Sequence, residues 1–219
     1  MNFLKKNINH TPFVGVFCAL SNKVILLPPT IGKKDEKEFE EKLSVRAVKS
    51  TLGNSTLVGV LALLFEEKIV VPGITTREEQ KSLEKQGLEV MELGQTDAFG
   101  NLATMNEFHG FASPLLSKEK VSAMEKFFGV KFSRQKITET DITGACLEAN
   151  SNGFIVNPGV SAKDFEELEK KLQVKGVATT ANYGDRLVGN SILVNNHGAI
   201  IGSITTTHEM IRIDEAFRR

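Results

Sequence analysis

The chain has 219 residues, 41% of them hydrophobic, and its 27 lysines and arginines balance its 27 aspartates and glutamates. Neutralising nucleic-acid phosphates requires a basic surface, so this balance argues against an affinity dominated by that interaction and leaves only a local basic patch open. No apolar run approaches the ~20 residues of a membrane span. Residues 13–20 follow two lysines as in a weak signal peptide, but no small-residue cleavage site comes after them, and we expect a cytoplasmic protein.

The sequence contains an internal repeat. Apolar strands end at Pro28, Pro72, Pro114, Pro158 and Gly202, at intervals of 44, 42, 44 and 44 residues. Near-equal intervals of this size are typical of repeat proteins, in which each unit is one supersecondary element. We therefore expect a single α/β domain of five units. Their approximate bounds are 1–52, 53–99, 100–143, 144–188 and 189–219.

Each unit is predicted to contain two strands joined by a tight turn, then a helix and a third strand. The third strands of the first four units are predicted at 44–50, 88–94, 130–136 and 174–181. In the fourth unit, residues 150–153 have the Asn/Gly composition of a hairpin turn. The first helix is expected to begin near Asp35, because Ile31 stands where the other units have a capping residue.

The other helices are predicted to begin at a Ser or Thr three residues after the Pro or Gly that ends the second strand. The predicted caps are Thr75, Ser117, Ser161 and Thr205. A side-chain oxygen there accepts a hydrogen bond from an otherwise unpaired amide of the first helical turn. Glu78 and Asp164, three residues further on, suit a capping box or the helix dipole.

A loop with Gly-Asn follows the third strand in several units. The pairs are Gly53-Asn54, Gly100-Asn101 and Gly189-Asn190, with Gly144-Ala145 in the fourth unit. The glycines are interpreted as turn residues with positive φ. Equivalent loops of a repeat protein come out on one face, so the three asparagines are predicted to form a polar ring.

The units are predicted to close into a ring. A unit of about 44 residues cannot bury its own apolar face, so neighbours must cover it. The last unit stops after its helix, and residues 1–11 could supply its missing third strand. This arrangement removes the open edges of the sheets. A WD-type propeller has a similar period, but it lacks the helix that recurs in every unit here.

The sequence offers no motif for catalysis, cofactor binding or metal binding. Nucleotide-binding glycine motifs are absent, and the histidines have no partner at metal-ligand spacing. His109 and His197 fall in equivalent hairpin turns and are expected to face solvent. Cys18 and Cys146 are predicted on the first strands of their units, as core residues in a reducing compartment; a disulfide or a nucleophile is the alternative.

Several stretches resemble a known family. They are KIVVPGITTREEQKSL from Lys68, FGNLATMNEFHGFASPLLS from Phe99, NSNGFIVNPGVSAKDFEEL from Asn150 and the segment from Val177 to Met210. These stretches and the five-unit period resemble the pentein fold and, within it, the translation initiation factor 6 family of ribosome anti-association factors, in an archaeal-type form.

The resemblance implies a non-enzymatic monomer without a cofactor that binds the intersubunit face of the large ribosomal subunit, through ribosomal proteins beside the sarcin–ricin loop. Asn101 corresponds to the asparagine of the family's L-G-N loop. Asn182, Tyr183 and Gly184 correspond to its V-N-R-G stretch, with tyrosine replacing arginine, so a cation for local rRNA contact is lost. The candidate contact residues are Asn54, Asn101, Asn106, Asn182, Tyr183 and Asn190.

Two alternatives remain open. Other penteins are enzymes that modify guanidino groups with a C-terminal cysteine nucleophile, but the fifth unit contains no cysteine. The second alternative is an interaction scaffold not connected with ribosomes. Co-sedimentation with the large subunit separates it from the ribosomal factor.

Overall fold

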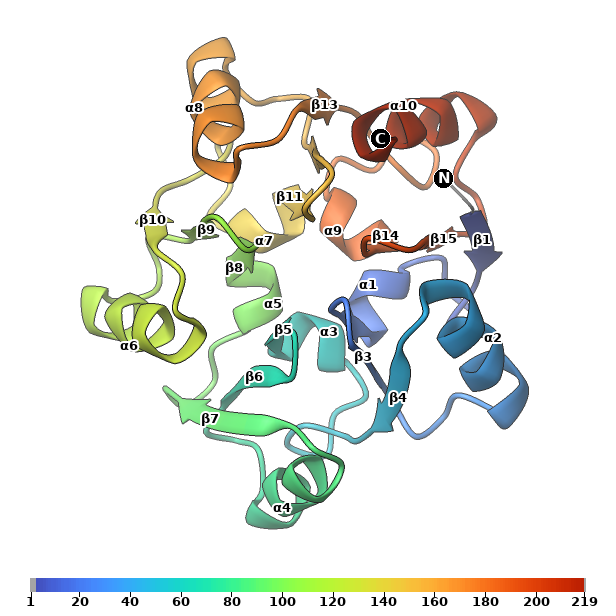
Figure 1. Ribbon diagram of the computed structural model, residues 1–219, viewed down its shortest axis with the longest axis vertical. Coiled ribbons are helices and arrows are strands. Elements are labelled where there is room, and N and C mark those ends of the chain that lie inside the picture. The colour runs from blue at the N-terminus through green and yellow to red at the C-terminus, as the bar shows by residue number, and fades with distance from the viewer. Residues whose placement is uncertain (1–2, 219) are drawn as a thin grey trace.

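Five small sheets surround one axis in the computed structural model, which describes residues 3–218 (Figure 1). Each sheet has three strands: an antiparallel hairpin and a third strand parallel to the second strand of the hairpin. The helix between the second and third strands lies at the outer edge. The predicted α/β ring of five repeated ββαβ units is confirmed.

The strands and outer helices of the five units follow in chain order. Unit one has β2 (Ala19–Leu20), β3 (Val24–Leu27), α2 (Lys33–Leu43) and β4 (Arg46–Lys49); unit two has β5 (Leu63–Phe65), β6 (Lys68–Pro72), α4 (Arg77–Lys85) and β7 (Glu89–Leu93). Unit three has β8 (Ala103–Met105), β9 (Gly110–Ala112), α6 (Lys118–Phe128) and β10 (Phe132–Arg134); unit four has β11 (Leu147–Ala149), β12 (Phe154–Val156), α8 (Ala162–Leu172) and β13 (Gly176–Ala178). Unit five has β14 (Ile192–Val194), β15 (Ala199–Gly202) and α10 (Thr207–Phe217).

The N-terminal strand closes the ring, as predicted. β1 (Phe3–Lys6) pairs in parallel with β15, in register from Phe3 opposite Ala199 to Lys6 opposite Gly202. It thereby supplies the third strand of the fifth sheet, and the two ends of the chain meet there (Figure 1). Closure leaves the β15 edge paired, which removes a template for association with other chains.

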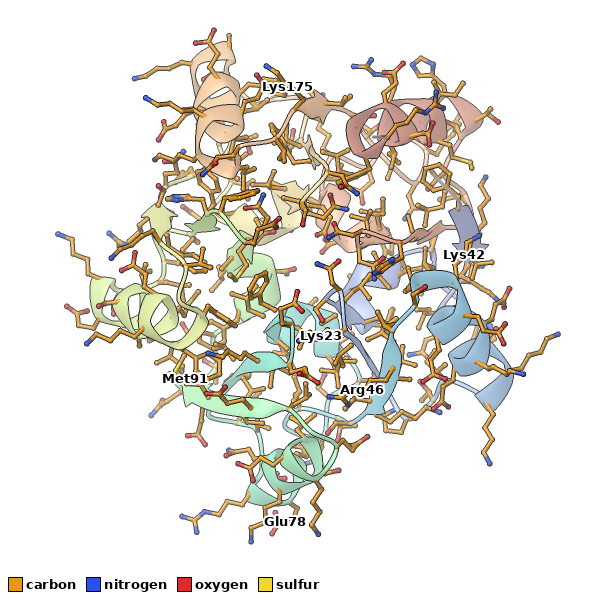
Figure 2. The ribbon with its side chains drawn as sticks, viewed as in Figure 1. Lys23, Lys42, Arg46, Glu78, Met91 and Lys175 are labelled. Atoms are coloured by element: carbon orange, nitrogen blue, oxygen red, sulfur yellow. The ribbon has the colours of Figure 1, made fainter. Side chains whose placement is uncertain are left out.

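The hydrophobic core is shared between neighbouring units. One cluster joins Leu63 and Val70 of unit two to Met105, Phe128 and Phe132 of unit three. Since each small sheet covers its neighbour, no unit needs a core of its own. Charged side chains such as Glu78 and Lys175 lie at the outer edge of the disc (Figure 2).

Two of the predicted helix caps are wrong by one residue. Thr76 and Thr206 accept the capping hydrogen bonds, and each forms a capping box with a glutamate, Glu79 or Glu209. Thr75 and Thr205 are buried just before these caps, where a residue packs against the first helical turn. Ser117 and Ser161 are caps, as predicted.

The first helix also begins earlier than predicted. Ile31 takes the buried position before the cap, so Gly32 is the cap and α2 begins at Lys33, two residues before Asp35.

A ring of five short helices around the axis was not predicted. These helices are α1 (Val14–Phe17), α3 (Val58–Leu61), α5 (Phe99–Leu102), α7 (Thr143–Cys146) and α9 (Val188–Ser191). They run across the unit boundaries expected at 99/100, 143/144 and 188/189. Four residues are too few to show a helical period.

Each of these five helices, here called hub helices, carries one glycine, here called a hub glycine, that packs against the preceding hub helix of the ring. A Cβ on Gly15, Gly59, Gly100, Gly144 or Gly189 would lie 2.0, 2.0, 1.8, 2.2 or 2.7 Å from a carbonyl oxygen of another hub glycine. These glycines are therefore required for close approach, and the turn interpretation of Gly100, Gly144 and Gly189 is wrong. It is correct for Gly53-Asn54, where φ is 60° and 61°.

The hairpin turns are linked in series by side chains. Asn106 donates to the backbone oxygen of Asn150 at 3.3 Å, Asn150 to that of Asn195 at 3.0 Å, Asn195 to that of Ser21 at 3.2 Å, and Ser21 to that of Glu66 at 2.7 Å. These bonds connect units three, four, five, one and two.

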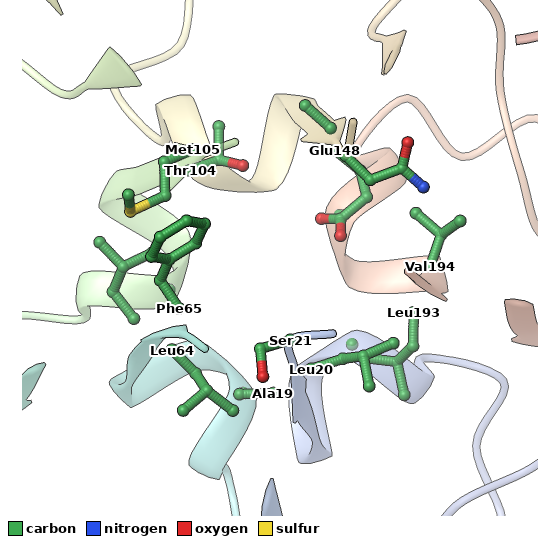
Figure 3. Close-up of a pocket in the computed structure, with 18 of the residues that line it drawn as sticks. Ala19, Leu20, Ser21, Leu64, Phe65, Thr104, Met105, Glu148, Leu193 and Val194 are labelled. Carbon is green, nitrogen blue, oxygen red and sulfur yellow. The ribbon is translucent and has the colours of Figure 1, made fainter. Parts of the chain in front are cut away.

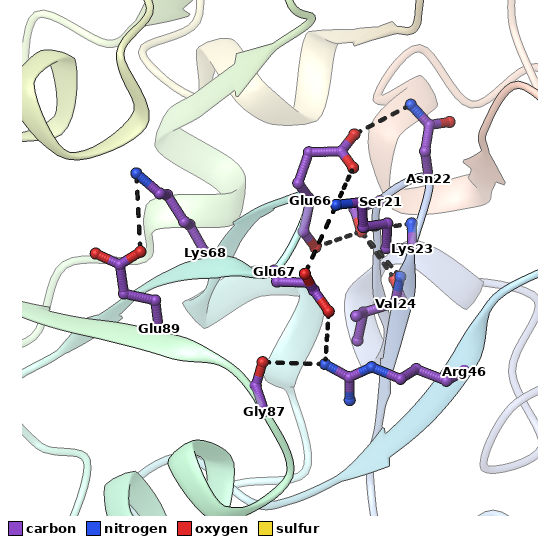
Figure 4. Close-up of polar contacts among 10 residues, drawn as sticks. All are labelled: Ser21, Asn22, Lys23, Val24, Arg46, Glu66, Glu67, Lys68, Gly87 and Glu89. Atoms are coloured by element: carbon purple, nitrogen blue, oxygen red, sulfur yellow. Dashed lines mark hydrogen bonds and ion pairs between the residues drawn. The ribbon is translucent and has the colours of Figure 1, made fainter.

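Charged pairs strengthen the contact between units one and two. Lys23 contacts Glu66 at 3.8 Å and Glu67 at 3.6 Å (Figure 4). At the contact between units two and three, the Lys68 ammonium donates to the backbone oxygen of Phe127 at 2.6 Å. The ring is therefore held by polar bonds as well as by its shared core.

Candidate functional site

The structure places the six predicted contact residues in three different environments. Asn101 and Asn190 lie on the hub helices α5 and α9 and line a cavity on the axis. Asn106 lies in the turn between β8 and β9, and the others lie in two turns that precede α3 and α9. The predicted ring of Asn54, Asn101 and Asn190 is wrong. Asn101 and Asn190 directly follow a hub glycine, whereas the residue after the hub glycine Gly59 is Val60, and Asn54 lies in a separate turn.

Hydrogen bonds to Glu79 fix the turn at Asn54. The carboxylate of Glu79 accepts from the amide of Gly53 at 2.8 Å, the amide of Asn54 at 3.0 Å and the hydroxyl of Thr51 at 2.5 Å. Burial alone would raise the pKa of Glu79, but these hydrogen bonds favour its charged form and the pKa is lowered. The Asn54 side chain is left exposed on a fixed backbone.

The turn at Tyr183 repeats this arrangement. Glu209 accepts from the amides of Tyr183 and Gly184 at 3.1 and 2.8 Å and from the Thr180 hydroxyl at 2.7 Å. Burial would raise the pKa of Glu209, yet the bonds from Thr206, Thr180 and Gly184 lower it overall. Tyr183, at 80% exposure, is presented to solvent from this fixed turn.

Two of the six predicted contact residues support the fold from inside it. Asn182 is buried and donates to the Pro12 oxygen at 2.8 Å and to the Ser191 hydroxyl at 2.9 Å. Asn106 is buried and donates to the Leu172 oxygen at 2.9 Å. Both therefore hold neighbouring segments together, and neither presents its side chain at the surface.

The sequence did not reveal three exposed apolar residues that precede outer helices. Ile74, Leu115 and Ile204 stand two residues before the caps of α4, α6 and α10 and are 42%, 63% and 53% exposed. A Cβ on Gly53 would contact the Ile74 side chain at 3.0 Å, so Ile74 lies beside the turn of Asn54. All three residues stand two positions before a helix cap. This common spacing could have been found in the sequence only if the caps had been assigned correctly.

The cavity on the axis has a volume of about 110 Å³ and takes its lining from all five units (Figure 3). The ionisable groups among its lining residues are Cys18, Glu66, Glu107 and Glu148. Burial raises the pKa of Cys18 and of Cys146. A thiol with a raised pKa is a poor nucleophile, and no imidazole belongs to the part of this lining that residues 3–218 form.

The two cysteines are buried and free, as expected of core residues. Their predicted place on strands is wrong, because Cys18 directly follows α1 and Cys146 ends α7. His197 faces solvent, as predicted. His109 does not: its ring packs on Phe111 and its Nε2 lies 2.8 Å from the Ser133 hydroxyl.

No group of three His, Cys, Asp or Glu side chains that could hold a metal ion converges within residues 3–218. In the same range, none of the helices is long and apolar enough to span a membrane.

The comparison with known families matches the whole ring. A model of the family described as the eIF-6 family covers residues 3–216. The chain belongs to the eIF-6 family. Translation initiation factor 6 of Natronomonas pharaonis is 33% identical over 215 residues, which cover 97% of each chain. Translation initiation factor 6 of Haloquadratum walsbyi is 30% identical over 214 residues, covering 97% of this chain and 95% of the relative.

The eIF-6 family member shares its fold with an enzyme domain of much lower sequence similarity. The N-terminal domain of ArgZ, an arginine dihydrolase from cyanobacteria, superposes with a TM-score of 0.59 at 17% identity, covering 85% of this chain and 76% of that one. Similarity at this level shows the pentein fold alone. Membership of the eIF-6 family assigns the chain a role in translation initiation.

Proposed function

We propose that this eIF-6 family protein binds the large ribosomal subunit on its intersubunit face and prevents association with the small subunit. The observation that carries the proposal is the family match over residues 3–216. The equal numbers of acidic and basic residues support contact with ribosomal proteins, beside the sarcin–ricin loop, more than contact with bare rRNA.

The proposed mechanism is steric exclusion by a stiff monomeric ring in the cytoplasm, without catalysis. A protein that occupies the docking face shifts subunit association by mass action and needs only affinity and a controlled rate of release. The closed ring supports this role, because interacting loops held by a rigid scaffold lose little conformational freedom on binding.

We place the direct contacts at Asn54, Asn101, Tyr183 and Asn190. Asn54 and Tyr183 are exposed on turns that Glu79 and Glu209 fix, and Asn101 and Asn190 are half-buried residues that line the axial cavity. Asn106 and Asn182 are proposed to act indirectly, because their amide groups hold other segments in place.

The test is co-sedimentation of purified protein with large subunits and with mixed subunits. Asn101→Lys is expected to weaken large-subunit binding at least 10-fold, about 1.4 kcal/mol, by forcing a charge into a polar contact. Ser122→Lys adds the same charge on the exposed side of α6 and should bind as the unchanged protein does. Equal co-sedimentation of both variants would rule out Asn101 as a contact.

The mixed-subunit experiment tests the function itself. Added protein should increase the fraction of free subunits and travel with the larger one. If the protein sediments with neither subunit, the proposed function is wrong whatever the result for Asn101.

A further inference from the structure

One acidic side chain in the hub has no counterpart in the other units. In each unit, one residue of the first strand lines the axial cavity. It pairs with the second residue of the neighbouring strand of the hairpin. The residues at this position are Leu20, Leu64, Thr104, Glu148 and Leu193. Three of the five units have leucine at this position, so an apolar side chain is compatible with the fold. The carboxylate of Glu148 is therefore not needed for folding.

The carboxylate of Glu148 has no hydrogen-bond or ion-pair partner among the described residues. Figure 3 shows it directed into the opening, across from Leu20 and Leu193. No lysine, arginine or histidine belongs to the cavity lining within residues 3–218. Glu148 is half-buried, and a carboxylate that is partly removed from water without a partner is unfavourable in its charged form. Burial accordingly raises the pKa of Glu148 to about 8. Glu148 is thus a charged residue at an otherwise mostly apolar position, and no contact offsets its cost to stability. Residues of this kind are typical of functional sites.

The surroundings of Glu148 select for positive charge. The other ionisable groups among the described lining residues are Glu66 and Glu107, at the hairpin turns, and the thiol of Cys18. The Glu66 carboxylate already contacts the Lys23 ammonium at 3.8 Å, which leaves Glu107 and Glu148 as the uncompensated carboxylates of the described lining. All of these lining groups are acids, so ionisation of any of them adds negative charge. A recess lined by one sign of charge concentrates ions of the opposite sign.

The volume of the cavity and the number of available metal ligands indicate which class of cation fits. Calcium takes six to eight oxygen ligands, mostly from the protein, and no cluster of three metal-binding side chains occurs within residues 3–218. A hydrated magnesium ion on one carboxylate is distinguished by titration below. A volume of about 110 Å³ accommodates a few waters or one compact organic group. Amide and backbone oxygens of the rim can accept further hydrogen bonds from such a group.

We propose that the axial cavity is a binding site for a compact organic cation, an ammonium or guanidinium group, which pairs with the carboxylate of Glu148. The cation is either a free small molecule or the end of a basic side chain of a partner. With a free cation as occupant the site is independent of the proposed ribosomal function, whereas a basic side chain of the large subunit as occupant rests on that function. Binding displaces the proton from Glu148, so affinity rises with pH as the carboxyl ionises.

The test uses methyl spectra of the full chain labelled at Leu and Met, because Leu20, Leu64, Leu193 and Met105 surround the cavity. Methylguanidinium and methylammonium are titrated at pH 6 and pH 9, with sodium chloride to match ionic strength. Saturable shifts confined to the cavity methyls are expected. With a pKa of about 8, the ionised fraction rises from about 1% to about 90%, so affinity should increase by nearly two orders of magnitude.

Variants separate the site from general charge effects. Glu148→Gln and Glu148→Leu should abolish the saturable shifts, and the leucine variant is compatible with folding because three units carry leucine there. Glu84→Gln, on the exposed side of α4, removes the same charge and should bind both cations normally. Unchanged shifts in Glu148→Gln, or saturable binding of magnesium in preference to both cations, would overturn the proposal.

The source of the cation is decided by co-sedimentation of Glu148→Gln with large subunits. Weaker co-sedimentation identifies a basic side chain of the subunit as the occupant, and unchanged co-sedimentation identifies a free cation. Absence of saturable shifts at pH 9, together with normal co-sedimentation, refutes the cavity site and leaves the proposed function intact.

Discussion

The hub glycines provide the sharpest test of how the ring is packed. In Gly100→Ala the new methyl carbon would lie 1.8 Å from the carbonyl oxygen of Gly59 and 2.8 Å from that of Ala62. Ordinary contacts of this kind begin near 3.4 Å, so α5 and α3 would have to separate by more than 1 Å. Both atoms that meet the methyl group are backbone, and a closed ring has no free end to absorb the displacement.

The expected cost follows from overpacking. Extra methyl groups forced into packed interiors cost about 1–3 kcal/mol, and a backbone clash within a closed ring belongs at the upper end. The higher helix propensity of alanine returns at most about 1 kcal/mol. A net loss of about 2–3 kcal/mol corresponds to a fall in melting temperature of roughly 4–12 °C for a chain of this size.

The assay is thermal unfolding of a graded series of alanine variants. Loss of stability should follow the clash distance, largest for Gly100 at 1.8 Å and smallest for Gly189 at 2.7 Å. Gly159→Ala is the matched control, since its nearest neighbour is a side-chain oxygen at 3.3 Å. A Gly100→Ala melting temperature within 1 °C of the unchanged protein would refute the packing argument.

Two further predictions concern the turns and the closure of the ring. Because the pKa of Glu209 is lowered on folding, its stabilisation is present above the ordinary carboxyl pKa of about 4.3 and is lost as pH falls through the folded value. Glu209→Gln should therefore cost about 2 kcal/mol at pH 7 and flatten the loss of stability between pH 5 and pH 3, measured by urea unfolding; an equally steep acid profile would contradict this. Removal of residues 1–6 should expose the β15 edge and produce association in analytical ultracentrifugation, reversed by a peptide of residues 1–11; a stable monomer without the peptide would show that closure by β1 is dispensable.

The sequence by itself determined the number of units, their order of strands and helix, and the closure of the ring. The spacing of Pro28, Pro72, Pro114 and Pro158 is a local pattern repeated along the chain, and local patterns survive in a single sequence. The missing strand of the last unit likewise required a donor, and only the N-terminal segment was unassigned.

The tertiary structure alone decided which residues meet. Gly100 and Gly53 both precede an asparagine, yet one packs against a neighbouring helix and the other forms a turn with φ of 60°. Asn106 and Asn182 are buried because carbonyl oxygens of other segments need their amide groups. Glu148 is an ordinary strand residue in the sequence. Its difference is visible only when the equivalent positions of the units are compared, because three of them carry leucine. Contacts between units depend on the geometry of the closed ring, which no single stretch of sequence contains.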